Sequence, residues 1–271
     1  FFFEDAIQMS KVLDLTLTGK DCGLDERAPM CGIPYHSAEG YINKLINMGY
    51  KVAICEQLSN VPEKGKKVVD REVVRIITPG TLVDEGMLED KKNNYLCCIY
   101  QNQDKIGISY CDISTGEFET CKIAGKNFIK DLNDMLVRVM PAEVLCNNNF
   151  VSENDLPICK LGLVSKFSHF DEKYFDFELT NQCLIEQFGN SYSTEFGLKD
   201  KECISSSGSL LRYILETQKR DLKHINSIRI CNNKKFMTID INTRRNLEIL
   251  ETIKDRRKKE YFISIVEKNM E

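Results

Sequence analysis

The sequence predicts an α/β protein built from more than one module, and three observations lead to that prediction. Residues 4–81 alternate stretches of helical apolar spacing with short β-rich runs. Residues 95–146 read as strand, strand, strand, helix, strand, which is an α/β order. Between them, residues 82–94 are polar and acidic and have little apolar periodicity, so we expect a linker there.

The first module is predicted to alternate helices with strands. Residues 4–15 place apolar side chains close to helical spacing and lead toward a strand at 15–18. Ser37 is expected to cap a second helix that runs to Met48, with Gly49 closing it. The other predicted elements are a polar loop at 19–27, a turn-rich segment at 29–36, a buried strand at 52–56, a basic loop at 62–67 and a β-rich run at 68–78 that stops at Pro79-Gly80.

The second module begins at Tyr95 and opens with three predicted strands. Ser114-Thr115-Gly116 joins the last two as a tight turn, because its glycine can adopt a positive φ. Pro141 ends the helix that follows. In chain order we expect strands at 95–101, 105–113 and 117–123, a helix at 128–140, a strand at 142–146, an irregular stretch at 147–180, and helices at 181–188 and 206–220. A third region opens with a strand at 236–239 and a helix at 243–254.

Composition limits the classes of function. The chain has 271 residues, of which 42% are hydrophobic and 29% charged, an ordinary globular mixture. Its formal net charge is −4, so any nucleic-acid contact must use local basic patches. No apolar run is long enough for a membrane span, and no signal-peptide pattern opens the chain. The 12 cysteines include no Cys-x-x-Cys pair and are accompanied by only 3 histidines, so we expect reduced, mostly buried thiols of a cytoplasmic protein and no zinc site.

Motifs of two common enzyme classes are missing from the sequence. Lys64-Gly65-Lys66 lacks the first glycine and the hydroxyl residue of a phosphate-binding P-loop, so nucleotide binding of that kind is excluded. No Gly-x-Ser-x-Gly elbow is present either. We therefore expect this chain to carry out no chemistry of its own.

Asp112 leaves two interpretations open. It lies next to a predicted hairpin and could form a carboxylate metal site with Asp5, Asp14 or Asp240. Alternatively, it accepts hydrogen bonds within the turn ahead of Ser114. The sequence favours the turn, because no other carboxylates occupy matching strand positions.

Several polar side chains of the first module are suited to a nucleic-acid backbone. Lys20 follows a predicted strand, and Gln57 stands at the end of another. Arg71 and Arg75 are four residues apart in one strand, which predicts that both point to one face and can hold phosphate oxygens. Tyr35-His36 could press against the backbone. Solvated surface charge and a packed Pro-Tyr turn are the alternatives, so these residues alone support only a soluble α/β protein with weak basic patches.

Five stretches go further, because they resemble the MutS family of DNA mismatch-repair proteins in order and spacing. Residues 29–36, Pro-Met-Cys-Gly-Ile-Pro-Tyr-His, resemble the family's Pro-Met-x-Gly-Ile-Pro-Tyr-His segment. Residues 52–57 resemble its next buried strand, and 71–81 the segment that closes the mismatch-reading domain. Residues 112–118 resemble the hairpin of the connector domain, and 240–249 the start of the core domain.

The resemblance implies a domain plan. Residues 1–88 would form a mixed-sheet mismatch-recognition domain, 89–94 a linker, and 95–222 a connector domain with a ribonuclease-H-like layout but without that enzyme's role. Residues 223–271 would begin an α-helical core, or lever, domain. The tail from Asp255 departs from the family pattern, and we expect the chain to be a piece of a longer protein that carries an ATPase elsewhere.

One departure concerns the residues that read the mismatch. In the family, a Phe-x-Glu pair within Gly-Asp-Phe-x-Glu-Leu-Phe does so, and Phe2-Phe3-Glu4 imitates that motif. Counted back from Ala6, however, Phe2 matches the later phenylalanine of the family pattern, so the reading pair is expected before residue 1. Phe2 should then lie on the buried approach to the first helix.

The function implied by the resemblance is binding of mismatched double-stranded DNA, which is kinked from the minor groove because a mispaired step unstacks at lower cost. Lys20, Gln57 and Arg71 are the expected backbone contacts, Tyr35-His36 would lie in a supporting loop, and Arg75 is a weaker candidate. No cofactor is expected in this chain.

The resemblance also implies properties of the whole protein. Full-length family members use ATP and magnesium, form dimers, bind a downstream MutL-type partner and work in the bacterial cytoplasm at the nucleoid. Two alternatives remain open: a metal-dependent nuclease that uses Asp112, and a piece that only mediates protein contacts through its connector.

Overall fold

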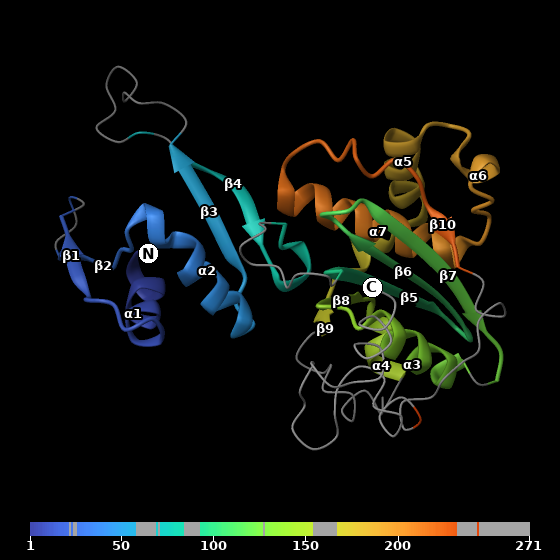
Figure 1. Cartoon of the computed structure of the whole chain (residues 1–271), viewed down its shortest axis with the longest axis horizontal. Helices are drawn as coiled ribbons and strands as arrows, with labels where there is room; N and C mark the ends of the chain where they lie inside the picture. The colour runs from blue at the N-terminus through green and yellow to red at the C-terminus, as the bar shows by residue number, and fades with distance from the viewer. Residues whose placement is uncertain are drawn as a thin grey trace, which may run out of the picture. The chain divides into compact units, whose positions relative to one another are not determined.

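The computed structural model describes residues 1–21, 23, 26–57, 69, 71–83, 93–126, 128–153, 167–231 and 243. The chain divides into two compact units, Phe1–Lys92 (unit 1) and Asn93–Glu271 (unit 2), which Figure 1 colours along the sequence. The predicted elements at 62–67 and 236–239 lie outside the described residues, as does all of 243–254 except Thr243.

Unit 1 begins with a helix and a short hairpin. Helix α1 (Phe3–Val12) has Ala6 fully buried in a small core, which confirms the helix predicted from apolar spacing. Strands β1 (Thr18–Lys20) and β2 (Ala28–Met30) then pair antiparallel. The strand thus starts at Thr18, later than predicted, because Leu13 ends the helix and Asp14 follows it with a positive φ of 55°.

Helix α2 (Ala38–Asn47) is the second helix of unit 1, and it runs nearly as predicted. Gly49 has a φ of +87°, the left-handed geometry that glycine supplies after a helix. Ser37, however, caps the helix with no side-chain hydrogen bond. It is the last residue of the 3-10 turn η1 (Tyr35–Ser37) and already has a helical backbone, whereas a side-chain cap requires an extended one.

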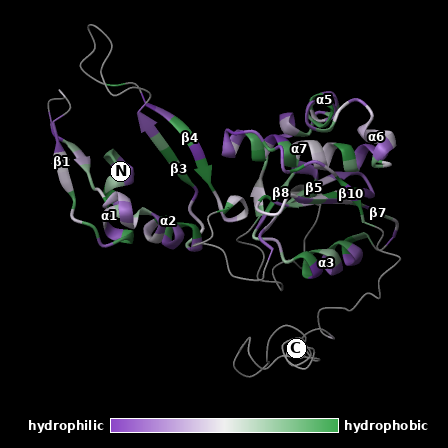
Figure 2. Cartoon of the chain, turned by 45° about the horizontal axis from the view of Figure 1, so that its top comes forward, coloured by the Kyte–Doolittle hydropathy of each residue, from purple (hydrophilic) through white to green (hydrophobic). Residues whose placement is uncertain are grey.

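A second antiparallel hairpin of unit 1 consists of β3 (Val52–Gln57) and β4 (Arg71–Ile77). The strand predicted at 52–56 is present, but it is not buried: Val52 and Ile54 are half-buried and the other residues of β3 are exposed. Only one face of this two-stranded sheet is covered. On that face, Val52 and Ile54 pack against a cluster that contains Ile46 of α2 and Ile77 of β4. Figure 2 shows hydrophilic residues at the end of β3 and the start of β4.

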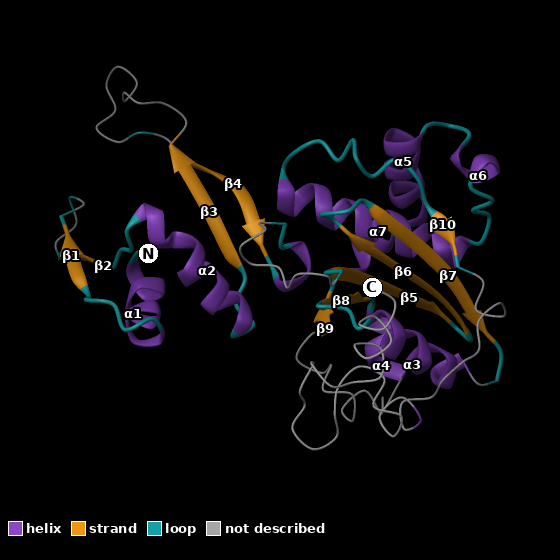
Figure 3. Ribbon diagram, viewed as in Figure 1, coloured by secondary structure: helices purple, strands orange, loops and turns teal. Residues whose placement is uncertain are grey.

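In the part of unit 2 that the structure describes, the strands form a six-stranded mixed sheet in the order β10-β7-β6-β5-β8-β9. At its centre, β5, β6 and β7 form an antiparallel meander, and β8, β9 and β10 pair parallel to their neighbours. Figure 3 shows α3 on one face of the sheet and α5 and α7 on the other. The strands are β5 (Tyr95–Asn102), β6 (Lys105–Asp112), β7 (Glu117–Ala124), β8 (Glu143–Cys146), β9 (Phe167–His169) and β10 (Arg229–Ile230). The helices are α3 (Phe128–Val139), α4 (Asn148–Glu153), α5 (Phe177–Phe188), α6 (Tyr192–Glu195) and α7 (Lys201–Gln218).

The local pattern of residues 95–146 is confirmed almost residue for residue. The three strands, the helix after them and the next strand all appear, and Gly116 in the connecting turn has a φ of +76°. The mixed α/β class predicted for the chain is therefore confirmed. Residues 147–180 are less irregular than predicted, because α4, β9 and the start of α5 lie within them.

Helix α7 packs against the sheet at unusually close range. A Cβ added to Gly107 of β6 would lie 2.0 Å from the backbone oxygen of Glu202, so only glycine fits there. Ser109 of β6 is hydrogen-bonded at 2.7 Å to Ser206 and at 2.9 Å to Ser207 of the helix. These hydroxyls bond one another within the contact, so serines, which are normally found at surfaces, are fully buried here.

The cysteines that the structure describes are ten free thiols, of which eight are buried. The prediction that most of them are buried is confirmed for this set. Cys55 is exposed and Cys231 is intermediate. Within the described residues, no helix has the length and apolar character needed to cross a membrane.

Candidate nucleic-acid interface

The first residues of the chain extend the β1–β2 hairpin. The Phe1 amino group donates to the Cys31 carbonyl at 2.9 Å, and the Cys31 amide donates to the Phe1 carbonyl at 3.2 Å. Phe2 forms an antiparallel bridge with Met30 and is the N-cap residue of α1. Phe2 thus lies on the approach to the first helix as expected, but that approach is not buried, because 44% of Phe2 is exposed.

Lys20 lies beside this exposed phenylalanine. Phe2 and Thr18 both pair with Met30, and Lys20 follows Thr18 by two residues, so these four side chains share one face. The Lys20 ammonium nitrogen is 6.0 Å from the centroid of the Phe2 ring. This distance is at the limit of a cation–π contact, and both side chains are open to a ligand.

Tyr35 and His36 occupy the 3-10 turn η1 that precedes α2. Tyr35 is 96% exposed, and His36 is exposed as well. The alternative of a packed Pro-Tyr turn is therefore wrong for these side chains. An aromatic ring held almost wholly in solvent on a short rigid turn can stack on, or press against, a ligand surface.

Gln57 and Arg71 face each other at the end of the β3–β4 hairpin that adjoins its connecting segment, and both are exposed. A directly paired amide and guanidinium present several N–H donors side by side, which suits a row of phosphate oxygens. Cys55 pairs with Val73 two positions along the hairpin, so these two side chains lie on the same face as Gln57 and Arg71. Sequence reasoning missed Cys55, although a strict alternation along β3 would have placed it with Gln57.

Arg75 does not share the face of Arg71, which corrects the prediction from their spacing. The pairing runs Cys55 with Val73 and then Ile54 with Arg75, so Val74 is an extra residue on β4. Such a β-bulge shifts the alternation by one position. Arg75 therefore lies on the half-buried Ile54 face, and sequence spacing alone could not reveal the inserted residue.

Asp112 of unit 2 accepts the hydrogen bonds that hold the turn after β6. Its Oδ1 accepts from the Ser114 amide at 2.8 Å, the Ser114 hydroxyl at 2.6 Å and the Thr115 amide at 3.3 Å. Its Oδ2 accepts from the Asn94 amide at 3.0 Å, and the residue is 1% exposed. The turn interpretation is confirmed. Among the described residues no cluster of three or more His, Cys, Asp or Glu side chains could hold a metal, and Asp240 lies outside them.

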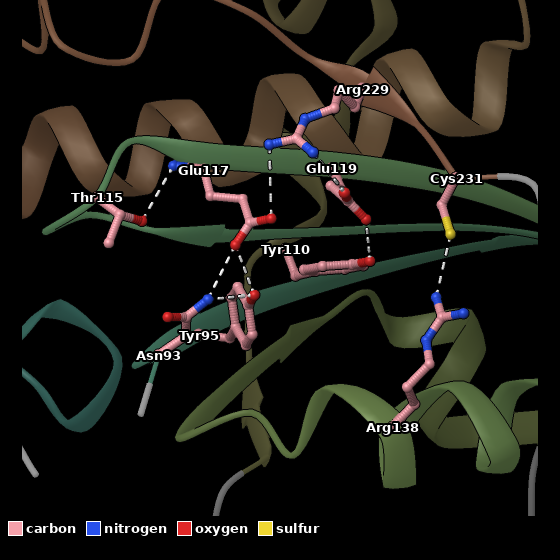
Figure 4. A network of polar contacts seen from close by, with 9 residues as sticks. All are labelled: Asn93, Tyr95, Tyr110, Thr115, Glu117, Glu119, Arg138, Arg229 and Cys231. Carbon is pink, nitrogen blue, oxygen red and sulfur yellow. Dashed lines mark hydrogen bonds and ion pairs between the residues drawn. The ribbon is translucent and has the colours of Figure 1, made fainter. Parts of the chain in front are cut away.

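A polar network joins Asn93 and Arg229 of unit 2 to Glu117 of β7 (Figure 4). The Glu117 carboxylate accepts from the Tyr95 hydroxyl at 2.7 Å and from Asn93 at 2.9 Å, and Arg229 lies 3.7 Å away. Burial, followed by the hydrogen bond to Glu117, raises the pKa of Tyr95 to about 12. Asn93 is the first residue of the unit and Arg229 belongs to β10, so Glu117 links these two segments to β7.

Comparison with known proteins accounts for both units. The profile described as MutS domain I matches residues 1–86, and that described as MutS domain II matches residues 94–226. The chain belongs to the MutS family. The first match lies within unit 1 and the second within unit 2.

Individual MutS relatives align along nearly the whole chain. The DNA mismatch repair protein MutS of Acetivibrio thermocellus is 41% identical over 273 residues, which is 99% of this chain and 31% of that protein. Those of Alkaliphilus oremlandii and Clostridioides difficile are 43% and 42% identical, over 98% of this chain in each case. The chain spans about a third of the length of these relatives, 31% and 27% for the last two.

Proposed function

We propose that unit 1 binds double-stranded DNA containing mismatches and contacts its backbone through Lys20, Gln57 and Arg71. The observation that carries the proposal is that these three polar side chains are exposed on the hairpins of a unit matched by MutS domain I. With a net charge of −4, the chain offers no general attraction for DNA, so the contacts must be local. Arg71 can hold two phosphate oxygens at once, whereas Lys20 acts as a point charge.

Tyr35 and His36 would support the same contact from the η1 turn. The exposed tyrosine ring can lie against the sugar edge of a duplex bent away from it. A mismatched step stacks poorly, so kinking it from the minor groove costs less than the few kcal/mol expected for paired DNA. Arg75 lies on the opposite face of the hairpin, so we assign the phosphate contact to Arg71 instead.

We also propose that unit 2 is a connector with the ribonuclease-H-like layout and without catalysis. Its antiparallel meander followed by parallel strands, with helices on both faces, supports this. In the whole protein, we expect dimerisation and ATP with magnesium to involve regions beyond the third of the relatives that this chain matches, whereas a MutL-type partner would contact the connector. Lys64-Gly65-Lys66 does not fit a P-loop, so we assign no nucleotide-binding role to it.

Fluorescence anisotropy with labelled matched and mismatched duplexes over a salt series tests the proposal. We expect weak, salt-dependent binding with little mismatch preference, because Phe2 stands in the register of the family's later phenylalanine. Lys20→Gln and Arg71→Gln should each weaken binding. Lys44→Gln, on the exposed surface of α2, is the matched control and should not.

Two outcomes would count against the proposal. Unchanged affinity in both Lys20→Gln and Arg71→Gln would remove the assigned contacts. No binding of either duplex by the intact chain would favour the alternative in which unit 2 only mediates protein contacts. A strong preference for the mismatched duplex would show, separately, that the register given to Phe2 is wrong.

A further inference from the structure

Two cysteines lie side by side where β10 pairs with β7 in unit 2. Strand β10 pairs parallel with β7, with Arg229 opposite Glu119 and Ile230 opposite Thr120. The Cys231 amide continues this pairing by donating to the Thr120 carbonyl at 2.8 Å. The next position on β7 is Cys121, so Cys121 and Cys231 are neighbours across the strands.

Both thiols belong to the same face of the sheet. Cys121 is a member of the apolar cluster beneath α3, and Cys231 packs against that cluster. Figure 4 shows the Cys231 side chain directed toward Arg138 of α3. Neighbouring strands are about 4.8 Å apart. A disulfide needs a Cα separation of roughly 4.4 to 6.8 Å, so the placement is compatible with one.

The two thiols differ in access and surroundings. Cys231 is partly exposed, whereas Cys121 is 2% exposed. A guanidinium nitrogen of Arg138 donates to the Cys231 sulfur at 3.1 Å. The contact places a positive charge and a hydrogen-bond donor beside the sulfur that an oxidant can reach. Cys231 therefore has the features of an attacking thiol and Cys121 those of a resolving one.

We propose that Cys121 and Cys231 form a reversible disulfide when the protein meets a peroxide. This modification site is independent of the proposed DNA binding, because it lies in unit 2 and uses none of the assigned contact residues. The bond would join β10 covalently to β7. It would therefore hold the end of the described sheet more firmly than the two-residue strand and its long Arg229 ion pairs do.

The reaction balances with one peroxide and two thiols. The Cys231 thiolate attacks one peroxide oxygen, the O–O bond breaks, and hydroxide leaves while Cys231 becomes a sulfenic acid. The Cys121 sulfur then attacks the sulfenic sulfur, the S–O bond breaks, and an S–S bond forms. The thiol protons and the departing hydroxides give water. Two thiols are oxidised by two electrons in total, and one hydrogen peroxide is reduced to two waters.

Other cysteines of the sheet provide contrasts. Cys97 and Cys146 lie in the same cluster but are fully buried, and burial raises the pKa of Cys146 to about 12. A peroxide cannot reach a fully buried thiol, so neither of these two can act as the attacking thiol. Cys111 is opposite Phe118, one position from the Tyr110–Glu119 pair, so it lies on the other face of the sheet and cannot reach Cys231.

Peptide mapping of the intact chain after hydrogen peroxide treatment and thiol blocking tests the proposal. Trypsin should release residues 106–122, which contain Cys111 and Cys121, and residues 230–234, which contain Cys231. We expect these two peptides to be cross-linked and two hydrogens lighter than their sum, with the bond assigned to Cys121 by fragmentation. Thiol reductant should separate them.

Variants make the assignment decisive. The cross-link should be lost in Cys121→Ser and Cys231→Ser and kept in Cys97→Ser and Cys111→Ser. In Cys121→Ser, the sulfenic acid of Cys231 should persist and be trapped by dimedone, a readout that does not require the disulfide. Arg138→Gln should slow the oxidation of Cys231, with circular dichroism confirming that each variant is folded. Untouched Cys231 in peroxide-treated wild type, or a bond from Cys231 to any other cysteine, would overturn the proposal.

Discussion

Arg71 and Arg75 lie on opposite faces of the β3–β4 hairpin, because the extra residue Val74 reverses the alternation between them. Arg71 shares the exposed face of Cys55 and Gln57. Arg75 shares the face of Ile54, which packs toward the cluster of Ile46 and Ile77. One strand therefore places its two arginines in different surroundings.

Substitutions of the two arginines should have different effects, one on the affinity for DNA and the other on the stability of unit 1. Arg71→Gln is expected to weaken DNA binding and to reduce the slope of log affinity against log salt by about 0.9, the value for one phosphate contact. Arg75→Gln should leave that slope unchanged and lower the stability of unit 1 by about 1 kcal/mol, because side-chain nitrogens of Arg75 are buried. Anisotropy titrations and thermal melts of both variants measure this; a reversed assignment would mean that the bulge is misplaced.

Elements held by local signals could be predicted from the sequence. The meander of β5, β6 and β7 follows from β-rich runs joined by a turn that ends at Gly116, and its strand limits agree within one residue. Tyr35 and His36 were also identified correctly as a turn, because Pro34 directly before them constrains the backbone. The start of the predicted turn-rich segment was wrong, since Pro29 lies in β2.

Elements that depend on distant partners could not be predicted. The first turn of α7, from Lys201, was missed because Ser206 and Ser207 look like the start of a helix and not like its interior. Their hydroxyls are acceptable inside only because Ser109, about a hundred residues earlier, is there to bond them. The contact of Phe2 with Lys20 likewise requires a bridge to Met30 that no sequence pattern announces.

Phe2 is expected to position Lys20 for its DNA contact. Phe2→Leu should weaken binding by no more than about 1 kcal/mol, the size of an exposed cation–π contact. In a Lys20→Gln background the same change should have no effect, because the cation is gone. Phe3→Leu is the matched control, since Phe3 is also exposed, at 53%, and starts the same helix. Additive losses in the double variant would show that the two residues act separately.

Gly107 should tolerate no side chain. Gly107→Ala would place a methyl group 2.0 Å from the Glu202 carbonyl oxygen, so α7 must shift away from β6. We expect a loss of about 3 kcal/mol, at the upper end for overpacking. Gly40→Ala in α2 is the control, because nothing lies within 4 Å of its added Cβ. That change should stabilise the protein by about 0.5 to 1 kcal/mol, as alanine does in a helix. Denaturant titrations compare the two.

Tyr95 should make the stability of unit 2 fall at high pH. Its folded pKa is raised to about 12, whereas the unfolded value is 10.0. Above pH 10 the unfolded chain therefore binds fewer protons at this site than the folded one, and the free energy of unfolding decreases until about pH 12. Tyr95→Phe should show a smaller decrease over this interval than wild type. Denaturant midpoints measured from pH 9 to 12 would give this difference, and parallel curves for the two proteins would contradict it.

Asp112 should behave as a structural residue and not as a nuclease ligand. Its carboxylate accepts four hydrogen bonds that hold the Ser114 turn and the Asn94 backbone. Asp112→Ala leaves those donors unsatisfied in a buried place, and we expect a loss of about 2 to 4 kcal/mol. Asp131→Ala, on the exposed surface of α3, should cost less than about 0.5 kcal/mol. Incubation of labelled DNA with magnesium should give no cleavage by either variant or by wild type. Cleavage by wild type that disappears in Asp112→Ala but persists in Asp131→Ala would restore the nuclease alternative, because a turn residue has no means of acting on a phosphodiester.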